Sequence, residues 1–334
     1  MTPRTDFPNG ARFAFSILDD TDDSTRENVA PVYDTLRECG FRTTKTAWPL
    51  DSPEGSRLFF AADTLQNTSY LEFVHELVDD GFELAFHGAT MESSPRERTI
   101  RGLEFLHREF GQYPRLFCNH GFNRENLYWG RRRILLHLFP RLTSRFIARG
   151  RYHYLGDVEG SAYFWGDLCK EHIQYVRNFT FSRLNMLTVN PEMPYRLPET
   201  RYVNYWFSTA DAPDVHSFNQ LLTPERIDRL EQEGGVCILS THLGKGFATR
   251  SGLHPATAQI LRYISNKRGW FVPVSEILDH LLQHDHLRRG LSFCGRLRLL
   301  LSFLRDRAHR IAMARPSTKQ RLPVPASSSH DAVP

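Results

Sequence analysis

Short apolar runs alternate along most of the chain with segments in which apolar residues recur every three or four positions. The runs are typical of strands buried in a parallel sheet, and the segments are typical of amphipathic helices. The pattern predicts strands at 12–18, 41–50, 82–86, 115–119, 172–176, 203–208, 236–242 and 270–274. It predicts helices over 25–39, 69–81, 94–111, 255–266 and 275–283, and another beginning at Thr223-Pro224. Strands that alternate with helices favour a parallel α/β architecture, and we expect a distorted (β/α) barrel of seven to eight strands.

The first predicted strand ends in four carboxylates within five residues, at Asp19, Asp20, Asp22 and Asp23. Like charges packed so closely repel one another unless a cation or a proton lies among them. The segment 24–27 has the spacing of a capping box that starts a helix, so the acids lie on a strand-to-helix turn, where α/β folds place their chemistry. We expect Asp22 and Asp23 to cap that helix, and Asp19 and Asp20, at the strand end itself, to be functional.

Histidines follow three of the other predicted strands, at His87, His120 and His242. In a barrel the carboxyl ends of the strands meet at one face, so we expect these side chains to lie near Asp19 and Asp20. Carboxylate and imidazole ligands together suit a divalent ion, zinc first, with cobalt, nickel or manganese as alternatives. Such an ion generates a nucleophile from water, while a second carboxylate can act as base and a histidine as acid.

The order of these motifs resembles that of the NodB-like polysaccharide deacetylases, over about residues 12–282. Ile17-Leu18-Asp19-Asp20 is similar to the family's first motif, which implies Asp19 as the catalytic base and Asp20 as a metal ligand. His87 falls where the family's histidine motif belongs and is implied as a second ligand. Leu239-Ser-Thr-His242 is similar to the last motif, which implies His242 as the catalytic acid.

The chain departs from that family's pattern at two places. Met91 stands where the second histidine of the metal motif belongs, and a thioether is a poor ligand for such an ion. His120 is our first choice for the third ligand, with Asp22 or a water as alternatives. The family's proline-loop arginine is also missing, and Asn123, Arg124 or Arg177 could take over its contacts. The resemblance is therefore to a divergent member.

These observations predict a metal-dependent hydrolase that deacetylates an N-acetylated sugar or polysaccharide. The alternatives are a degenerate barrel that binds carbohydrate or a partner without catalysis, and a glycoside hydrolase that uses two carboxylates. Asn123, Arg177 and Trp206 are the expected substrate contacts. Several aromatic residues could form a wall for sugar stacking or could lie in the core: Trp129, Trp165, Tyr205 and Trp206.

Composition and charge separate a body from a tail. The five cysteines are scattered without a CxxC pair, which predicts a reducing, cytoplasmic location, and we expect neither a secretory leader nor a membrane span. The net charge is +4, but residues 284–334 hold ten basic and three acidic residues, which leaves 32 basic and 35 acidic residues in the body. We divide the chain into an N-terminal extension (1–11), the barrel (12–284), a basic amphipathic helix (285–313) and a disordered tail (314–334).

The predicted basic helix carries one apolar stripe with arginines over much of its remaining surface. The stripe consists of Leu287, Leu291, Cys294, Leu297, Leu301, Leu304, Ala308 and Ile311, widened by Leu300 and Phe303. Either the stripe packs on the barrel, or the helix lies on an anionic membrane at the cytoplasmic side, beside a lipid-linked sugar. No feature of the chain indicates a nucleic-acid partner.

Overall fold

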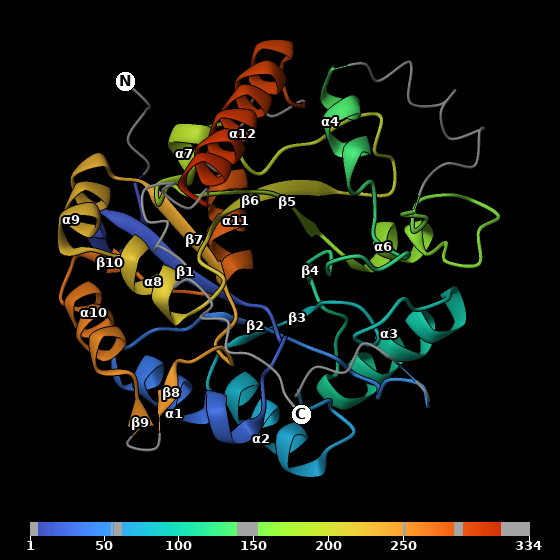
Figure 1. Cartoon of the computed structure of the whole chain (residues 1–334), viewed down its shortest axis with the longest axis horizontal. Helices are drawn as coiled ribbons and strands as arrows, with labels where there is room; N and C mark the ends of the chain where they lie inside the picture. The colour runs from blue at the N-terminus through green and yellow to red at the C-terminus, as the bar shows by residue number, and fades with distance from the viewer. Residues whose placement is uncertain are drawn as a thin grey trace, which may run out of the picture.

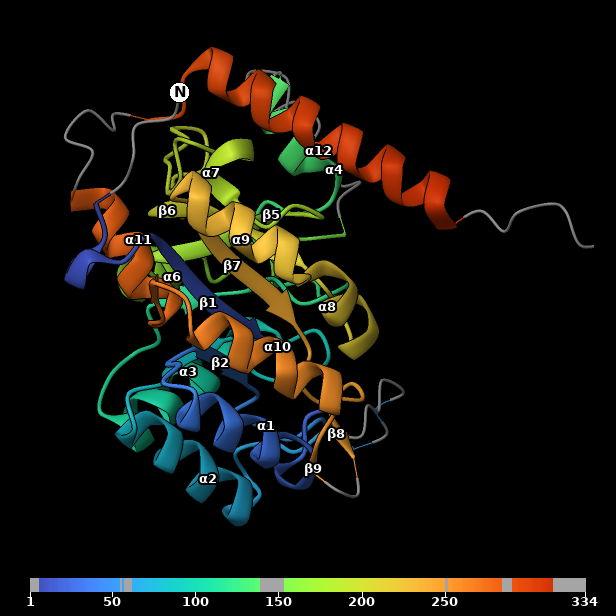
Figure 2. The same ribbon diagram turned by 90° about the vertical axis from the view of Figure 1, so that its left-hand side faces the viewer.

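The protein is a parallel barrel surrounded by helices (Figures 1 and 2), in a computed structural model that describes residues 6–54, 56, 62–138, 153–249, 252–283 and 290–314. The barrel strands are β1 (Phe13–Asp19), β2 (Thr44–Ala47), β3 (Glu83–Phe86), β4 (Leu116–Phe117), β5 (Tyr175–Phe181), β6 (Tyr205–Asp211) and β7 (Val236–Thr241). They follow one another in chain order, and pairing of β1 with β7 closes the barrel. The predicted (β/α) barrel is confirmed.

The barrel is distorted beside β1. A short additional strand, β10 (Gly269–Trp270), pairs with the beginning of β1, whereas β2 pairs with its end. A separate two-stranded sheet is formed by β8 (Ala248–Thr249) and β9 (Gly252–Leu253). All seven residues of β1 are buried, as expected for a parallel strand covered on both faces. β1 is therefore the central strand of the fold.

The helices connect the strands and cover the outside of the barrel (Figure 1). They are α1 (Arg26–Glu38), α2 (Thr68–Asp79), α3 (Arg96–Phe110), α4 (Arg131–Leu138), α6 (Gly166–His172), α7 (Met186–Val189), α8 (Val215–Leu221), α9 (Pro224–Glu233), α10 (Pro255–Ser265), α11 (Val274–Gln283) and α12 (Phe293–Ala314), with a 3₁₀ turn at Pro8–Gly10. No helix in these ranges is both long enough and apolar enough to cross a bilayer.

The start of α1 differs from the prediction. Thr25 is the N-cap, its hydroxyl accepts from the Asn28 N–H, and the Asn28 side chain accepts from the Thr25 N–H. The capping box therefore lies one residue beyond the predicted one. Asp22 and Asp23 do not cap the helix, because both precede the N-cap; Asp23 has a φ of 60° and belongs to the turn.

The fifth strand also differs from its predicted position. Residues 172–176 were expected to form it, but His172 ends α6, and β5 runs from Tyr175 to Phe181. The polar residues Arg177 and Asn178 interrupt its apolar pattern, although both are buried in the structure. Buried polar side chains on both faces of the strand therefore hid it from a prediction based on apolar runs.

The predicted basic helix forms as α12, which packs against α4, α7 and β5. Its inner face consists of Leu299, Leu300 and Phe303, and the Phe303 ring lies 4.7 Å from the Phe179 ring between centroids. Most of the predicted stripe points away from the barrel. The expectation that this stripe packs on the body is therefore wrong, because a different face of the helix packs there. Leu287 and residues 315–334 lie outside the described residues, and the predicted disorder of the tail stays a prediction.

Candidate functional site

Four side chains converge in a cluster formed by Asp22, His87, His120 and His242. The histidines lie after the carboxyl ends of three strands, and the aspartate lies in the turn after a fourth strand. Asp22 follows β1, His87 follows β3, His120 follows β4 and His242 follows β7. The Asp22 Oδ1 atom lies 3.5 Å from His87 Nε2 and 3.4 Å from His120 Nε2. Its Oδ2 atom lies 3.6 Å from His242 Nε2. The histidine–aspartate cluster thus has a carboxylate at its centre, and that carboxylate belongs to Asp22.

The tautomers of two of these histidines follow from their hydrogen bonds. His87 Nδ1 lies 2.9 Å from the Cys118 carbonyl oxygen, and His242 Nδ1 lies 2.8 Å from the Pro213 carbonyl oxygen. A carbonyl oxygen can only accept, so both Nδ1 atoms carry the proton. In the neutral rings the Nε2 lone pairs are therefore directed at Asp22, the arrangement in which metal-binding histidines are held by a second hydrogen bond.

The spacing and the chemistry of the cluster fit a divalent ion. The ligand atoms of Asp22, His87 and His120 lie within 4.8 Å of one another. Two ligands at about 2.0–2.1 Å from a tetrahedral ion are about 3.3–3.4 Å apart, close to the observed separations and longer than an ordinary hydrogen bond. Asp22 Oδ1 is also buried without a hydrogen-bond partner. An orphaned carboxylate oxygen facing two imidazoles is a donor set that zinc, cobalt or nickel accepts.

A second group with suitable donors, Asp20, His87 and Cys118, also lies within 4.8 Å. It fits an ion less well, because the thiolate is the ligand form and burial raises the pKa of the Cys118 thiol. The Cys118 carbonyl also occupies His87 Nδ1. The group around Asp22 is the better candidate.

Asp20 borders the cluster and is held by Arg177 of β5, across the barrel, and by Ser240 of the neighbouring strand β7. Its Oδ2 atom accepts from Arg177 Nη1 at 2.7 Å and from the Ser240 hydroxyl at 3.2 Å. Its Oδ1 atom is buried without a hydrogen-bond partner and lies 3.8 Å from His87 Nδ1. Burial alone would raise the pKa of Asp20, but the charges of Arg177, His87 and His242 together hold it below its usual value. Asp20 is therefore ionised with one oxygen uncommitted.

Asp19 faces the helix layer on the outside of β1. Its Oδ2 atom accepts from Lys45 Nζ at 2.8 Å and from the Tyr33 hydroxyl at 2.9 Å, and its Oδ1 atom accepts from the Leu243 N–H at 2.8 Å. Asp19 and Lys45 are both fully buried. The structure thus brings Asp20, His87, His120 and His242 together and gives both oxygens of Asp19 other partners.

The electrostatics of the cluster favour a charged carboxylate among the imidazoles. Burial raises the pKa of Asp22, but the close polar contacts with His120 and His87 and the charges of these histidines outweigh burial and hold it far below its usual value. Burial lowers the pKa of His120, yet Asp22 reverses the balance and raises it. Burial dominates at His87, whose pKa is lowered. A neutral His87 beside an ionised Asp22 is the state that binds a metal.

Neighbouring residues that the sequence reading did not select support the cluster. The Trp48 ring lies 5.5 Å from the His120 ring and 6.4 Å from the His87 ring between centroids. Glu125 is buried, accepts from the Ser94 N–H and from the Asn123 amide, and burial raises its pKa to about 7. Lys45 lies within a predicted buried strand, and this position could have indicated that the lysine is buried with a charged partner. Nothing in the local sequence distinguishes Glu125 from a surface residue.

The residues predicted to contact the substrate are buried, and they make contacts within the protein itself. Trp206 is 2% exposed and donates to the Thr200 hydroxyl, and Trp165 is fully buried, so neither offers a ring face to a sugar. The expectation of stacking on these rings is wrong, because they fill the core. Asn123 is buried beside Glu125, and Arg177 bonds Asp20. An aromatic that the sequence reading missed, Phe122, is 82% exposed and lies two residues after His120.

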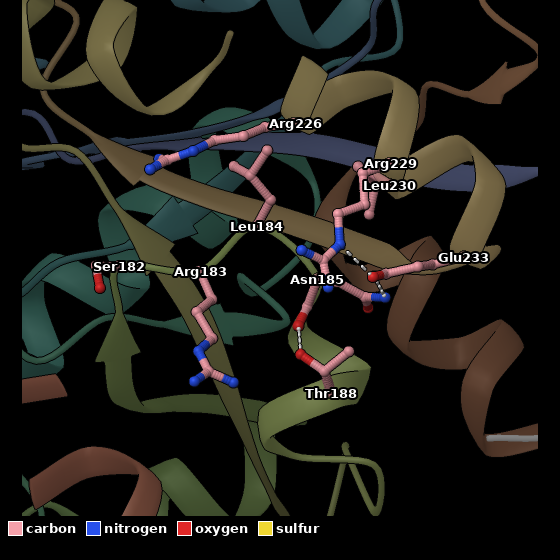
Figure 3. Close-up of a pocket in the computed structure, with 9 residues that line it drawn as sticks. All are labelled: Ser182, Arg183, Leu184, Asn185, Thr188, Arg226, Arg229, Leu230 and Glu233. Atoms are coloured by element: carbon pink, nitrogen blue, oxygen red, sulfur yellow. Dashed lines mark hydrogen bonds and ion pairs between the residues drawn. The ribbon is translucent and has the colours of Figure 1, made fainter. Parts of the chain in front are cut away.

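A surface pocket of about 420 Å³ lies apart from the cluster (Figure 3). Residues after β5 and residues of α7 and α9 line it, among them Arg183, Arg226 and Arg229. Arg229 is paired with Glu233. No residue of the histidine–aspartate cluster lines this pocket, so it is distinct from the candidate site.

No known protein-family model matches the sequence, and no curated protein is similar to it in sequence. Solved structures are similar in fold. A protein described as a polysaccharide deacetylase from Mycobacterium smegmatis aligns with a TM-score of 0.50 at 13% identity, over 86% of this chain and 96% of that chain. The chain has the polysaccharide deacetylase fold.

Two further structures align with the deacetylase fold of this chain. The PuuE allantoinase has a TM-score of 0.48 at 13% identity, over 84% of this chain and 94% of its own. A protein described as a polysaccharide deacetylase from Pseudomonas aeruginosa PAO1 has a TM-score of 0.48 at 14% identity, over 84% and 95%. The resemblance read from the motifs is confirmed for the deacetylase fold, and the roles of individual residues stay predictions.

Proposed function

We propose that the protein is a metal-dependent hydrolase that removes the acetyl group from an N-acetylated sugar or polysaccharide. The observation that carries this proposal is the convergence of three imidazole Nε2 atoms on the Asp22 carboxylate at 3.4–3.6 Å, at the carboxyl end of the barrel. Active sites of (β/α) barrels are built at that end. The polysaccharide deacetylase fold supports the choice of reaction.

Asp22, His87 and His120 would hold the divalent ion, and zinc is the first candidate for this mixed oxygen and nitrogen set. When bound, the ion would lower the pKa of a water and polarise the acetyl carbonyl. The cluster is accessible from solvent on one side, because the side chains of Asp22 and His242 are 13% and 18% exposed. His87, at 2%, forms the closed side. A substrate would enter past Asp22 and His242.

We propose Asp20, in place of the Asp19 that the family resemblance implies, as the base that takes the proton of the attacking water. Its Oδ1 atom is free to accept, while Arg177 and Ser240 fix the other oxygen. Arg177 would then make the base-orienting contact that the missing proline-loop arginine makes in the resembling family. Asp19, with three hydrogen-bond donors on its carboxylate, would hold β1, β2 and the loop after β7 together.

We propose His242 as the acid that protonates the leaving nitrogen of the sugar. Its Nδ1 proton is committed to the Pro213 carbonyl, so the transferred proton would be on Nε2, the atom directed at the cluster. It is the most exposed of the three cluster histidines and can approach a substrate. Phe122 would supply an apolar ring for one face of a neighbouring sugar, in place of the buried tryptophans.

We place the protein in the cytoplasm, and we propose that its carbohydrate substrate is lipid-linked. All five cysteines are free, which is consistent with a reducing compartment.

Metal content and acetate release test the function together. Protein purified without chelator should contain about one divalent ion per chain and should release acetate from N-acetylglucosamine oligomers. Bound metal without acetate release from any N-acetylated or O-acetylated glycan would favour a binding barrel. Cleavage of the glycosidic bond instead would favour a two-carboxylate hydrolase, which would leave the three histidines without a role.

A further inference from the structure

Helix α12 has a second apolar face that the barrel does not cover. Six large apolar side chains are exposed in the described part of the chain, and five of them lie on this helix. They are Phe293 (73% exposed), Leu297 (41%), Leu301 (42%), Leu304 (44%) and Ile311 (53%). At 100° per residue these positions, with the exposed Ala308, form one continuous stripe along about five turns of the helix.

The barrel holds α12 by a different face, so the stripe is not a poorly packed core. Leu299, Leu300 and Phe303 are buried against the body. Arg310 bonds both Asp211, the last residue of β6, and Asp306. Asp306 also accepts from the Ser182 N–H at 2.8 Å, directly after β5. The helix is therefore fixed along its length while its outer face stays open.

The charge on the exposed part of α12 has one sign. Arg298 and Arg305 are exposed along one border of the stripe, and Arg307 is exposed along the other. The helix has one acidic residue, Asp306, and its side chain is 9% exposed and faces inward to Arg310. A surface with an apolar centre and cationic borders complements an anionic lipid layer, which offers acyl chains beneath phosphate groups.

We propose that α12 docks the protein on an anionic membrane through this outer stripe. A second copy of the chain is a poorer occupant, although Leu297, Leu301, Leu304, Ala308 and Ile311 have the spacing of a coiled-coil seam. Two such helices would bring arginine borders against each other, and like charges beside a seam destabilise the pair. A lipid surface neutralises these borders.

The docked helix would hold the candidate site at the membrane surface. α12 runs in the same direction as the barrel strands, and its C-terminal end lies at their carboxyl ends (Figure 2). His309 and Arg310 line the same hollow as Pro213, whose carbonyl holds His242. The membrane contact and the mouth of the barrel are thus on adjoining surfaces. The docking itself rests on α12 alone and does not depend on the proposed hydrolase activity.

Vesicle binding by the full chain tests the proposal. Vesicles of phosphatidylglycerol and phosphatidylcholine in equal parts are compared with pure phosphatidylcholine by co-sedimentation, at about 0.1 M and about 1 M salt. We expect binding to the anionic vesicles only, weakened at high salt. Truncation before α12 is unsuitable, because it would uncover the partners of Leu299, Leu300 and Phe303.

Two double variants separate the contributions of the stripe and its borders. Leu301→Ser with Leu304→Ser should abolish the salt-resistant part of binding, and Arg298→Glu with Arg305→Glu should weaken binding by about 30-fold or more. The matched control is Arg101→Glu with Arg108→Glu, the same charge change at exposed positions of α3, which lies on another side of the barrel (Figure 1). The control should bind within about twofold of the unchanged chain.

Three outcomes would overturn the docking. The first is absence of binding by the unchanged chain. The second is equal loss from the α3 control, which would indicate a general charge effect. The third is a dimer in lipid-free solution that dissociates in the Leu301/Leu304 variant, which would assign the stripe to a second copy. Circular dichroism checks that the variants, all at exposed positions, keep the fold.

Discussion

The Asp19 carboxylate and the Lys45 ammonium lie 2.8 Å apart with both side chains shut off from solvent. Burial lowers the pKa of Lys45, but the charge of Asp19 and its hydrogen bond outweigh burial, and the pKa is raised. Lys45 is therefore charged, and the Asp19 carboxylate is its ion-pair partner in the core. The pair joins β1 to β2 directly beneath the candidate site.

Lys45→Met should destabilise the protein strongly, because it leaves the buried Asp19 charge without its partner. We expect a loss of about 3–5 kcal/mol in the free energy of unfolding, measured by urea denaturation. Adding Asp19→Asn should recover part of that loss. The matched control is Lys267→Met at the exposed pair with Asp228, which water already solvates and whose loss should therefore destabilise the protein much less. Equal effects at the two lysines would contradict the structural role of the buried pair.

The second prediction ranks the candidate metal ligands. His87→Ala and Asp22→Asn should abolish stoichiometric metal, measured by elemental analysis after equilibration with zinc. Asp20→Asn and His242→Ala should retain it, because neither belongs to the proposed set. Metal retained by Asp22→Asn but lost from Asp20→Asn would restore the ligand implied by the family resemblance.

The third prediction separates the two aspartates proposed as base. Asp20→Asn and His242→Ala should each lose on the order of 10²-fold in kcat while keeping metal. Asp20→Asn should also lower the melting temperature, because the buried Arg177 loses its charged partner. Asp19→Asn should lower the melting temperature as well, but its remaining folded fraction should turn over near the normal rate. A stable, metal-loaded Asp19→Asn protein without activity would assign the base to Asp19.

The exposed Phe122 should contribute to substrate binding more than to chemistry. Phe122→Ala should raise KM for an oligosaccharide by about threefold to tenfold with little change in kcat, as expected for loss of one ring contact. Phe122→Trp should keep KM low. A fall in kcat at unchanged KM would exclude stacking.

The raised pKa of Glu125 predicts a pH-dependent stability. Its pKa rises from 4.5 to about 7, so the folded state binds a proton more tightly than the unfolded state does. The stability associated with this group is complete below pH about 4.5 and is lost as pH rises through about 7, a change of about 3 kcal/mol. Melting temperatures of chelator-treated protein should therefore fall between pH 5 and 8 by more than those of Glu125→Gln. Parallel profiles would show that Glu125 has an ordinary pKa.

The strands and the polar residues at their ends could be read from the sequence, because buried parallel strands are short apolar runs and parallel strands end on one face. Asp20, His87, His120 and His242 were predicted to meet, and the structure brings them together. Asp19 and Asp20 point to opposite faces of the strand, because successive strand residues alternate. The sequence does not tell which of the two faces the barrel interior. The placement of Asp22 depends on the turn through Asp23, which has a φ of 60°. No local sequence pattern predicts that backbone conformation.

Helix α12 illustrates the same limit on a larger scale. Its sequence has the period of a helix and enough apolar residues for two faces, so periodicity alone does not tell which face the barrel covers. The ring of Phe303 packs against Phe179, a residue more than a hundred positions earlier in the chain. Only the assembled barrel decides the orientation.

The pairing of β1 with β7 has a consequence for how the protein is made. Its register joins Ala14 to Val236 and Asp19 to Thr241, residues more than 220 positions apart. The Leu243 amide and the Ser240 hydroxyl, which bind the first two acids, leave the ribosome long after those acids do. A contact between such distant segments closes late in folding. During synthesis the acidic turn must therefore wait, hydrated and without these partners, until the last barrel strand arrives.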